Sequence, residues 1–226
     1  MKSPEIQKPR IIGMGAGGHC RVVIDLIRQL GCWHIEGVLD SDVSLHGGSL
    51  DGIPILGGDS LANHLHDQGI ISAFLGVGSI GNPGTRTRIF RSLCDLGFDF
   101  PALIHPKALV AGAVTVGPAS CVMQGSIINP GSTIGNAAII NSGAVVEHDC
   151  VVGDFSHISP GALLGGGVIV GMNSHVGMGA IIRQGIRIGR NVLVGTGAVV
   201  VADVPDGTTV LGIPARPVPP TNTSAS

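Results

Sequence analysis

The sequence predicts a chain of two parts, a small α/β domain over residues 1–103 and a three-sided parallel β-prism over residues 104–226. Three observations lead to this fold class. A glycine-rich segment, "GMGAGG" at residues 13–18, begins within the apolar run at residues 10–14. Short apolar runs then alternate with helix-like stretches up to about residue 100. From residue 104 a strict six-residue period replaces that alternation, and a fixed period indicates a repeat architecture.

The first part has the pattern β-α-β-α-β-α. The predicted strands cover residues 10–14, 35–39 and 72–76, and the predicted helices cover about 18–30, 60–68 and 85–96. This alternation is typical of a small parallel sheet with helices packed against it, a Rossmann-like half. The stretch "SLHGGSLDGIPILGGD" between these elements contains glycine and proline and is predicted to be irregular.

Gly13, Gly15 and Gly18 have the G-x-G-x-x-G spacing of dinucleotide-binding loops. The first glycine makes a tight turn, the second lets backbone approach a pyrophosphate, and the third lets a helix pack close to its strand. Asp40 ends the next apolar run, near the place where an acidic residue would hold a ribose hydroxyl. The motif alone is compatible with a nicotinamide or flavin enzyme.

The second part repeats every six residues. The following residues, six apart, are all aliphatic: Ile104, Val110, Val116, Val122, Ile128, Ile134, Ile140, Val146, Val152, Ile158, Leu164, Val170, Val176, Ile182, Ile188, Val194 and Val200. The residue four positions after each is small or aliphatic, and an aliphatic-Gly pair recurs every 18 residues from Val116-Gly117 to Ile188-Gly189. Three hexapeptides therefore form one coil, whose aliphatic corners are buried against the next coil and whose glycines serve turns with positive φ. Ordinary hairpins would not keep this register.

Composition limits the partners. The net charge is −2, and without a cluster of Lys and Arg we expect no nucleic-acid partner. Five cysteines without a C-x-x-C pair, and no apolar stretch of 18 residues, predict a cytoplasmic protein that does not insert into membranes. A prism with few charged residues should have sides that pack on neighbours, and a homotrimer is the natural closed assembly.

Five segments in order, "GMGAGGHCRVV", "GVGS", "LIHPKALV", "VVEHDCVVGDFSHISPGA" and "LGIPAR", resemble the hexapeptide acyltransferases. Within them, the chain resembles the sugar acetyltransferases of the bacillosamine, perosamine and sialic acid type, over nearly its whole length. The resemblance implies a left-handed β-helix, acetyl-CoA as co-substrate, no metal, and active sites between subunits. It also implies that the glycine-rich loop binds the nucleotide of a sugar and not a redox cofactor.

The resemblance further implies two sets of binding residues. Those expected to bind the nucleotide-linked sugar are Gly17, Gly18, His19, Asp40, Ser41 and Gly78. Those expected to contact acetyl-CoA are His157, Gly177, Met178 and Thr196. Arg86 and Arg88 could reach a diphosphate, but a solvated helix face is the favoured interpretation for both.

Moving an acetyl group from a thioester to an amine requires a proton acceptor with a pKa near 7. Of nine histidines, only His148 is flanked by two carboxylates, Glu147 and Asp149. A carboxylate that accepts from one ring nitrogen orients the imidazole and raises its basicity. We therefore predict His148 as general base and Asp149 as its partner, in agreement with the resemblance, with Glu147 the weaker candidate. His157 and His175, 18 residues apart, should stack on one edge of the prism.

These observations predict an enzyme that transfers an acetyl group from acetyl-CoA to the amine of a nucleotide-linked amino sugar. The expected sugar is a UDP- or GDP-4-amino-4,6-dideoxyhexose, for which the sequence does not distinguish the nucleotide. The nearest alternative is O-acetylation of a sugar hydroxyl, such as that of sialic acid. Two further alternatives are a zinc lyase, which would need three converging histidines, and a nucleotide-binding module without catalysis.

Overall fold

The computed structural model describes residues 8–79 and 84–218. These residues form two compact units, of which the first ends at Leu103 and the second begins at Ile104. Ser79 and Gly84 belong to the second unit. We call the first the α/β unit and the second the prism.

The α/β unit contains a five-stranded sheet with the order β3-β4-β2-β1-β5. Its strands are β1 (Arg10–Met14), β2 (His34–Leu39), β3 (Ser49–Leu50), β4 (Ile53–Gly57) and β5 (Ser72–Leu75). All neighbours are parallel except β3 and β4, which form an antiparallel hairpin. The three strands predicted from the sequence correspond to β1, β2 and β5.

The segment predicted to be irregular is in fact ordered as the short 3-10 helix η1 (Val43–Leu45) and the β3-β4 hairpin. Leu50 pairs with Ile53, so the hairpin loop consists of Asp51 and Gly52 alone. Both loop residues have positive φ, 49° and 79°, as a two-residue hairpin turn requires. The Asp-Gly pair is typical of a hairpin turn. The other glycines and the proline in the same segment led instead to the prediction of irregular structure.

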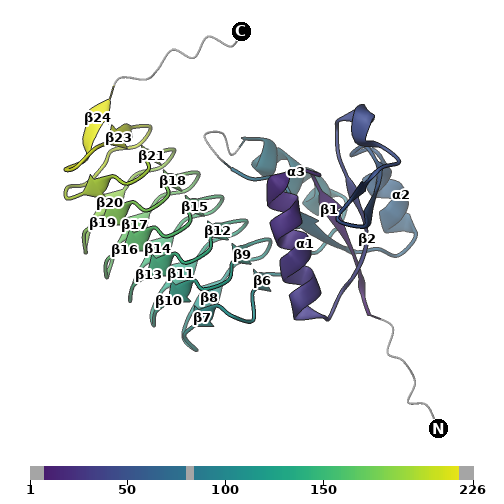
Figure 1. The fold of residues 1–226 in the computed structure, drawn as a ribbon, viewed down its shortest axis with the longest axis horizontal. Coiled ribbons are helices and arrows are strands. Elements are labelled where there is room, and N and C mark those ends of the chain that lie inside the picture. The colour runs from purple at the N-terminus through teal and green to yellow at the C-terminus, as the bar shows by residue number, and fades with distance from the viewer. Residues whose placement is uncertain (1–7, 80–83, 219–226) are drawn as a thin grey trace. The chain divides into compact units, whose positions relative to one another are not determined.

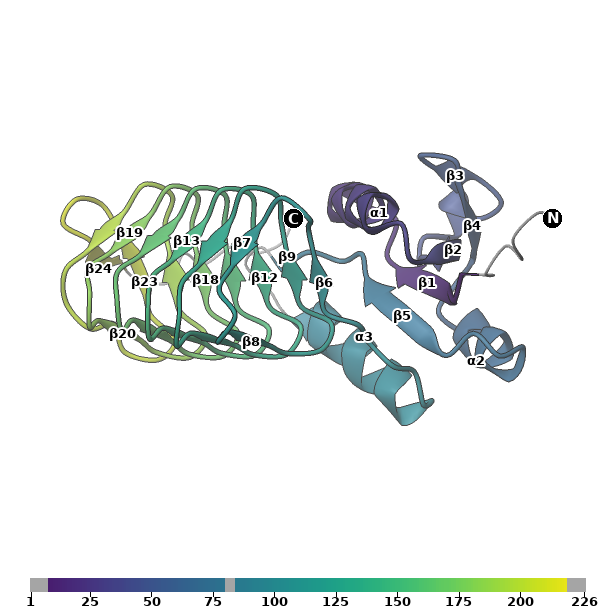
Figure 2. The same cartoon turned by 90° about the horizontal axis from the view of Figure 1, so that it is seen from below.

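Helices cover both faces of this sheet. Helix α1 (Gly18–Leu30) lies on one face, whereas α2 (Leu61–Asp67) and α3 (Gly84–Asp95) lie on the other (Figure 2). Helix α1 buries an apolar stripe that includes Val23, Ile24 and Ile27. In the part of the chain that the structure describes, no helix is long and apolar enough to cross a membrane.

The prism is a left-handed β-helix of stacked coils built from three sheets (Figure 1). The β7 sheet contains β7 (Leu109–Val110), β10 (Ile127–Ile128), β13 (Val145–Val146), β16 (Leu163–Leu164), β19 (Ile181–Ile182) and β22 (Val199–Val200). The β8 sheet contains β8 (Thr115–Val116), β11 (Thr133–Ile134), β14 (Val151–Val152), β17 (Ile169–Val170) and β20 (Arg187–Ile188). The β6 sheet contains β6 (Leu103–Ile104), β9 (Cys121–Val122), β12 (Ile139–Ile140), β15 (His157–Ile158), β18 (His175–Val176), β21 (Leu193–Val194), β23 (Thr209–Leu211) and β24 (Arg216–Val218).

The six-residue aliphatic position is the second residue of each two-residue prism strand, and from Val122 onward it is buried. These side chains therefore point inward from the flat faces and not from the corners, because the corners are occupied by turns. Residues 18 apart pair in parallel register, as Ile139 does with His157. The aliphatic core is thus a continuous column through the coils.

Four of the serines inside the column, Ser120, Ser132, Ser156 and Ser174, each form hydrogen bonds that bridge two coils. Ser174 is 1% exposed, yet its hydroxyl donates to the Gly189 carbonyl at 2.6 Å and accepts from the Val192 amide at 3.0 Å. Ser156 makes the same pair of contacts with Gly171 and Ser174. A buried hydroxyl with both a donor and an acceptor partner does not incur the cost of an unsatisfied polar group.

Removing one core side chain should destabilise the prism without altering its register. We expect Ile158→Ala to lower the free energy of unfolding by about 2–5 kcal/mol, since this fully buried residue would leave a cavity between coils. Urea unfolding followed by circular dichroism measures the change. Ile213→Ala, at a site 77% exposed, serves as the control. Equal stability of the two variants would contradict the packing described here.

Candidate active site

The glycine-rich loop of the α/β unit lies where the strand order reverses. Strand β1 has β2 on one side and β5 on the other, and ligands of such sheets bind at the carboxyl ends of the strands at this point. Gly13 sits inside β1, where an added Cβ would lie 2.4 Å from a ring atom of Phe74. Gly15 begins the turn with a φ of 94°, and its N–H donates to the Leu39 carbonyl at 2.7 Å.

Asp40 holds this loop in place. One carboxylate oxygen accepts from the Ala16 N–H at 2.6 Å, and the other accepts from the Asp42 N–H at 2.8 Å. The side chain therefore ties the turn after β1 to the end of β2. The contact with the nucleoside that the resemblance implies for Asp40 stays a prediction, beside these two backbone contacts. Its predicted neighbour Ser41 is exposed.

The other residues predicted to bind the sugar nucleotide are gathered around the same loop. Gly17 and Gly18 are exposed at the start of α1, and a Cβ on either would meet nothing within 4 Å. The start of a helix offers N–H groups and a positive dipole end to an anion. Gly78 is close to this helix start, because its added Cβ would lie 3.7 Å from Cβ of His19.

His19, which is half-buried, and the fully buried Arg86 lie close to this loop. Burial, followed by the nearby Arg86 charge, lowers the pKa of His19 to about 3, so its imidazole is neutral. Its Nε2 atom is buried without a hydrogen-bond partner among the described residues. Arg86 is 0% exposed, and its guanidinium donates to the carbonyl oxygens of Val77 at 2.6 Å and Leu75 at 3.3 Å.

The solvated helix face expected for Arg86 is therefore wrong, because its side chain turns inward to satisfy carbonyl groups at the end of β5. Arg88 does lie on the exposed face, 3.9 Å from a carboxylate oxygen of Asp59. Sequence could not separate the two arginines, because both are compatible with a polar helix surface.

His148 and Asp149 form a hydrogen-bonded pair on the surface of the prism. Nδ1 of His148 lies 2.9 Å from a carboxylate oxygen of Asp149, and the two side chains are 63% and 73% exposed. Because a carboxylate only accepts, Nδ1 carries the proton and Nε2 is left as the basic nitrogen. The hydrogen bond that His148 donates to Asp149, with smaller contributions from the charges of Asp149 and Glu147, raises the pKa of His148.

Asp149 occupies a backbone position that its stacked neighbours leave to glycine. Its φ is 59°, and the equivalent residues of the two adjoining coils, Gly131 and Gly167, and Gly185 one coil further on, have φ between 68° and 78°. Aspartate tolerates this left-handed conformation better than most residues, but at a cost that a structural turn could avoid with glycine. The replacement of glycine by aspartate in this column is readable from the sequence, and turns such as those at Ala137 and Phe155 also place non-glycine residues at positive φ.

The backbone of this turn is held from both neighbouring coils. The Asp149 N–H donates to the Pro130 carbonyl at 3.0 Å, and the His148 carbonyl accepts from the Gly167 N–H at 2.8 Å. Inside the prism, the Ser132 hydroxyl donates to the Glu147 carbonyl at 2.8 Å and accepts from the Cys150 N–H at 3.1 Å. The pair is therefore presented by a fixed backbone.

A shallow groove adjoins His148 on the prism surface. It is lined by Val145, Glu147, His148, Leu163, Leu164, Gly165, Gly166, Ile181, Ile182, Arg183 and Gln184. Its sides are thus mostly aliphatic, with charged groups at Glu147 and Arg183.

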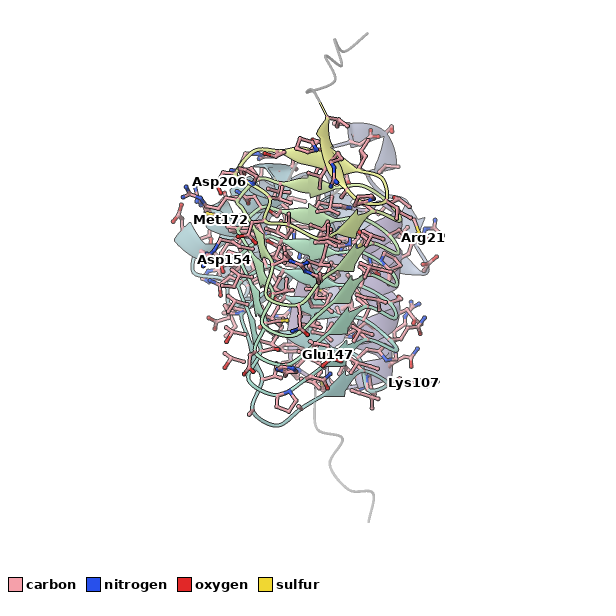
Figure 3. The ribbon with its side chains drawn as sticks, turned by 90° about the vertical axis from the view of Figure 1, so that its left-hand side faces the viewer. Arg21, Lys107, Glu147, Asp154, Met172 and Asp206 are labelled. Carbon is pink, nitrogen blue, oxygen red and sulfur yellow. The ribbon has the colours of Figure 1, made fainter. Side chains whose placement is uncertain are left out.

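Asp154, Met172 and Asp206 lie one above another along an edge of the prism, and the pairing of their coils agrees with this arrangement (Figure 3).

His157 and His175 stack one coil apart on the β6 sheet, as predicted. Their ring centroids are 4.8 Å apart in an edge-to-face arrangement. Nε2 of His157 lies 3.0 Å from the Asn141 amide nitrogen, and Nε2 of His175 lies 3.0 Å from the Ser159 hydroxyl. His157 is only 5% exposed, and burial lowers the pKa of His175.

The residues predicted to contact acetyl-CoA lie at a different corner from His148. Met178 and Thr196 are exposed on consecutive coils in the turns from the β6 sheet to the β7 sheet, and Gly177 begins the first of these turns. Gly177 has no room for a side chain, since its Cβ would lie 2.6 Å from backbone atoms of the next coil. His148 lies in the turn from the β7 sheet to the β8 sheet. One chain therefore does not bring the two sets together.

The structure also bears on metal binding. Within residues 8–79 and 84–218, no group of three or more His, Cys, Asp and Glu side chains is arranged to hold a metal ion.

Each of the two units matches a known family model. Residues 10–93 match the PglD N-terminal domain, and residues 131–166 match the bacterial transferase hexapeptide repeats. A comparison with curated protein sequences gave no significant match.

Solved structures resemble the chain over nearly its whole length. A mutant of perosamine N-acetyltransferase from Caulobacter crescentus, in complex with CoA and GDP-perosamine, is 36% identical with a TM-score of 0.88, covering 95% of this chain and 98% of that chain. The acetyltransferase domain of PglB from Neisseria gonorrhoeae, in complex with acetyl coenzyme A, is 38% identical with a TM-score of 0.86, covering 94% and 100%. WeeI from Acinetobacter baumannii is 28% identical with a TM-score of 0.80, covering 92% and 100%.

The fold of the two units and the matches to family models and solved structures indicate the same family. The chain belongs to the hexapeptide-repeat sugar acetyltransferase family and is an acetyl-CoA-dependent sugar N-acetyltransferase.

Proposed function

We propose that this enzyme acetylates the amine of a nucleotide-linked 4-amino-4,6-dideoxyhexose. The free amine attacks the thioester carbonyl of acetyl-CoA, and His148 accepts the proton that the nitrogen loses as the new C–N bond forms. The C–S bond then breaks, and the CoA sulfur receives the proton held by His148, so that CoA leaves as a thiol and His148 is neutral again. The observation that carries this proposal is the hydrogen bond between His148 and Asp149 on an exposed turn, which leaves Nε2 free and basic.

The α/β unit, over residues 1–103, is the part that binds the nucleotide. Support comes from the exposed glycines of the loop after β1 and from the anion-binding character of the start of α1. Gly17, Gly18, His19 and Gly78 surround the phosphates, with Asp40 shaping the loop. The GDP-perosamine bound to the Caulobacter relative supports a nucleotide-linked amino sugar as substrate.

A homotrimer with active sites between subunits completes this proposal. His148 lies at one corner of the prism, whereas Gly177, Met178 and Thr196 lie in turns at another corner and His157 lies on the β6 sheet. This separation supports a site to which a neighbouring chain supplies one of the two sets. The outward side of the β7 sheet carries a column of exposed aliphatic residues, including Leu109, Leu163 and Ile181 at 66%, 40% and 43% exposure. A large apolar patch of this kind is typical of a protein interface.

The substrate class is tested by offering an amine and a hydroxyl on the same scaffold. Purified protein is incubated with acetyl-CoA and either a UDP- or GDP-linked 4-amino-4,6-dideoxyhexose or its 4-hydroxy analogue. We expect thiol release and a product heavier by one acetyl group with an amino sugar only, as measured by a thiol reagent and mass spectrometry. Acetylation of the hydroxy analogue alone would favour the O-acetyltransferase alternative.

Replacing the base should abolish catalysis and leave the architecture in place. We expect His148→Ala to lower kcat about 10²- to 10⁴-fold, the usual contribution of a general base. CoA affinity by calorimetry and molar mass by ultracentrifugation should not change, since the side chain is 63% exposed. His64→Ala, on the exposed surface of α2, is the matched control. Full activity of the His148 variant would refute this assignment.

The pair should also determine the acidic limb of the pH profile. Only neutral His148 can accept a proton, so kcat/KM rises with pH through the raised pKa of His148. In Asp149→Asn, loss of the carboxylate lowers that pKa, so the limb should move to lower pH while the maximal rate falls. Rates measured from pH 5 to 9 test this prediction, and an unmoved limb would exclude Asp149 as the partner.

A further inference from the structure

The ring of His148 occupies the place that a Cβ atom of Gly166, in the next coil, would take. A Cβ added to Gly166 would come within 2.5 Å of Nε2, 2.6 Å of Cε1 and 3.1 Å of Cδ2 of that ring. These ring atoms are the three nearest neighbours of the added carbon. A side chain at residue 166 and the observed position of the imidazole therefore exclude each other.

The fold itself does not require glycine at this position. Gly165 and Gly167 are explained locally, because a Cβ on Gly165 would lie 2.6 Å from the Gln184 backbone nitrogen and Gly167 has a φ of 68°. Gly166 has no positive φ and no backbone atom among its closest neighbours. Residues in the same column, 18 apart, include Pro130, His148 and Gln184, so other coils accept a side chain here.

We propose that Gly166 is a positioning residue, whose missing side chain lets the His148 imidazole lie on the next coil with Nδ1 facing Asp149. The inference rests on the proposed role of His148 as base. The backbone at His148 and Asp149 is held by Gly167 and Pro130, so only the ring can yield to a new methyl group. Rotation of the ring would break its 2.9 Å contact with Asp149.

The close approach of the His148 ring to Gly166 predicts an effect of substitution that a purely structural glycine would not show. The imidazole is 63% exposed and can swing into solvent, so an added methyl group should cost little stability. The displaced ring would nevertheless lose its orientation, and a misplacement of about 1 Å in an active site can cost about 10²-fold in rate. A loss of kcat without a loss of stability is therefore characteristic of this role.

The test is Gly166→Ala, with Gly112→Ala as matched control. Gly112 lies in the same column, and its added Cβ would meet nothing within 4 Å. We expect Gly166→Ala to lower kcat about 10- to 100-fold with little change in KM or in thermal unfolding. By NMR titration, the pKa of His148 should fall towards its ordinary value. Gly112→Ala should match the parent protein in all four measurements.

A double variant separates this inference from the proposed function. If Gly166 acts through His148, adding Gly166→Ala to His148→Ala should cause no further loss of activity. Unchanged kcat and unchanged pKa of His148 in Gly166→Ala would overturn the inference, even if His148 proves essential. Conversely, a shifted pKa of His148 in Gly166→Ala together with full activity of His148→Ala would support the positioning role of Gly166 and reject His148 as the general base.

Discussion

The parallel register between residues 18 apart is the constraint on which the rest of this molecule depends. Each prism strand contributes one inward aliphatic residue, and each coil donates backbone hydrogen bonds to the next, so that equivalent residues form columns. Within a column, each residue is in contact with the residue 18 positions away. Asp149 shares its positive φ with the glycines of its column, and His148 is next to Gly166 in the adjoining coil, so the geometry of the His148–Asp149 pair depends on both columns.

In the proposed function, the two units contribute different parts of one reaction. A nucleotide carries its charge on phosphates, for which the turn after β1 and the start of α1 offer N–H groups. The prism offers an exposed histidine and aliphatic surface, which suit proton transfer and an acyl chain. The rigid backbone around His148, held by Pro130, Gly167 and Ser132, suits a group whose orientation must not change during the reaction.

Buried charge in the α/β unit has a structural purpose. Arg86 satisfies carbonyl groups at the end of β5, and its charge helps to keep His19 neutral. Asp40 likewise uses both carboxylate oxygens on backbone N–H groups. The loop is therefore preformed by side chains that lie behind it, and preorganisation of this kind reduces the entropy lost when a ligand binds.

Sequence alone determined the fold class, because the period of six needs only the spacing of aliphatic residues, and strands β1, β2 and β5 follow from apolar runs. It also singled out His148, since charged residues are rare in the prism. Only the tertiary structure showed that Arg86 is buried, that Asp40 supports the loop, and that Gly166 underlies the imidazole. These facts depend on side-chain direction and on contacts between distant segments, which no local pattern encodes.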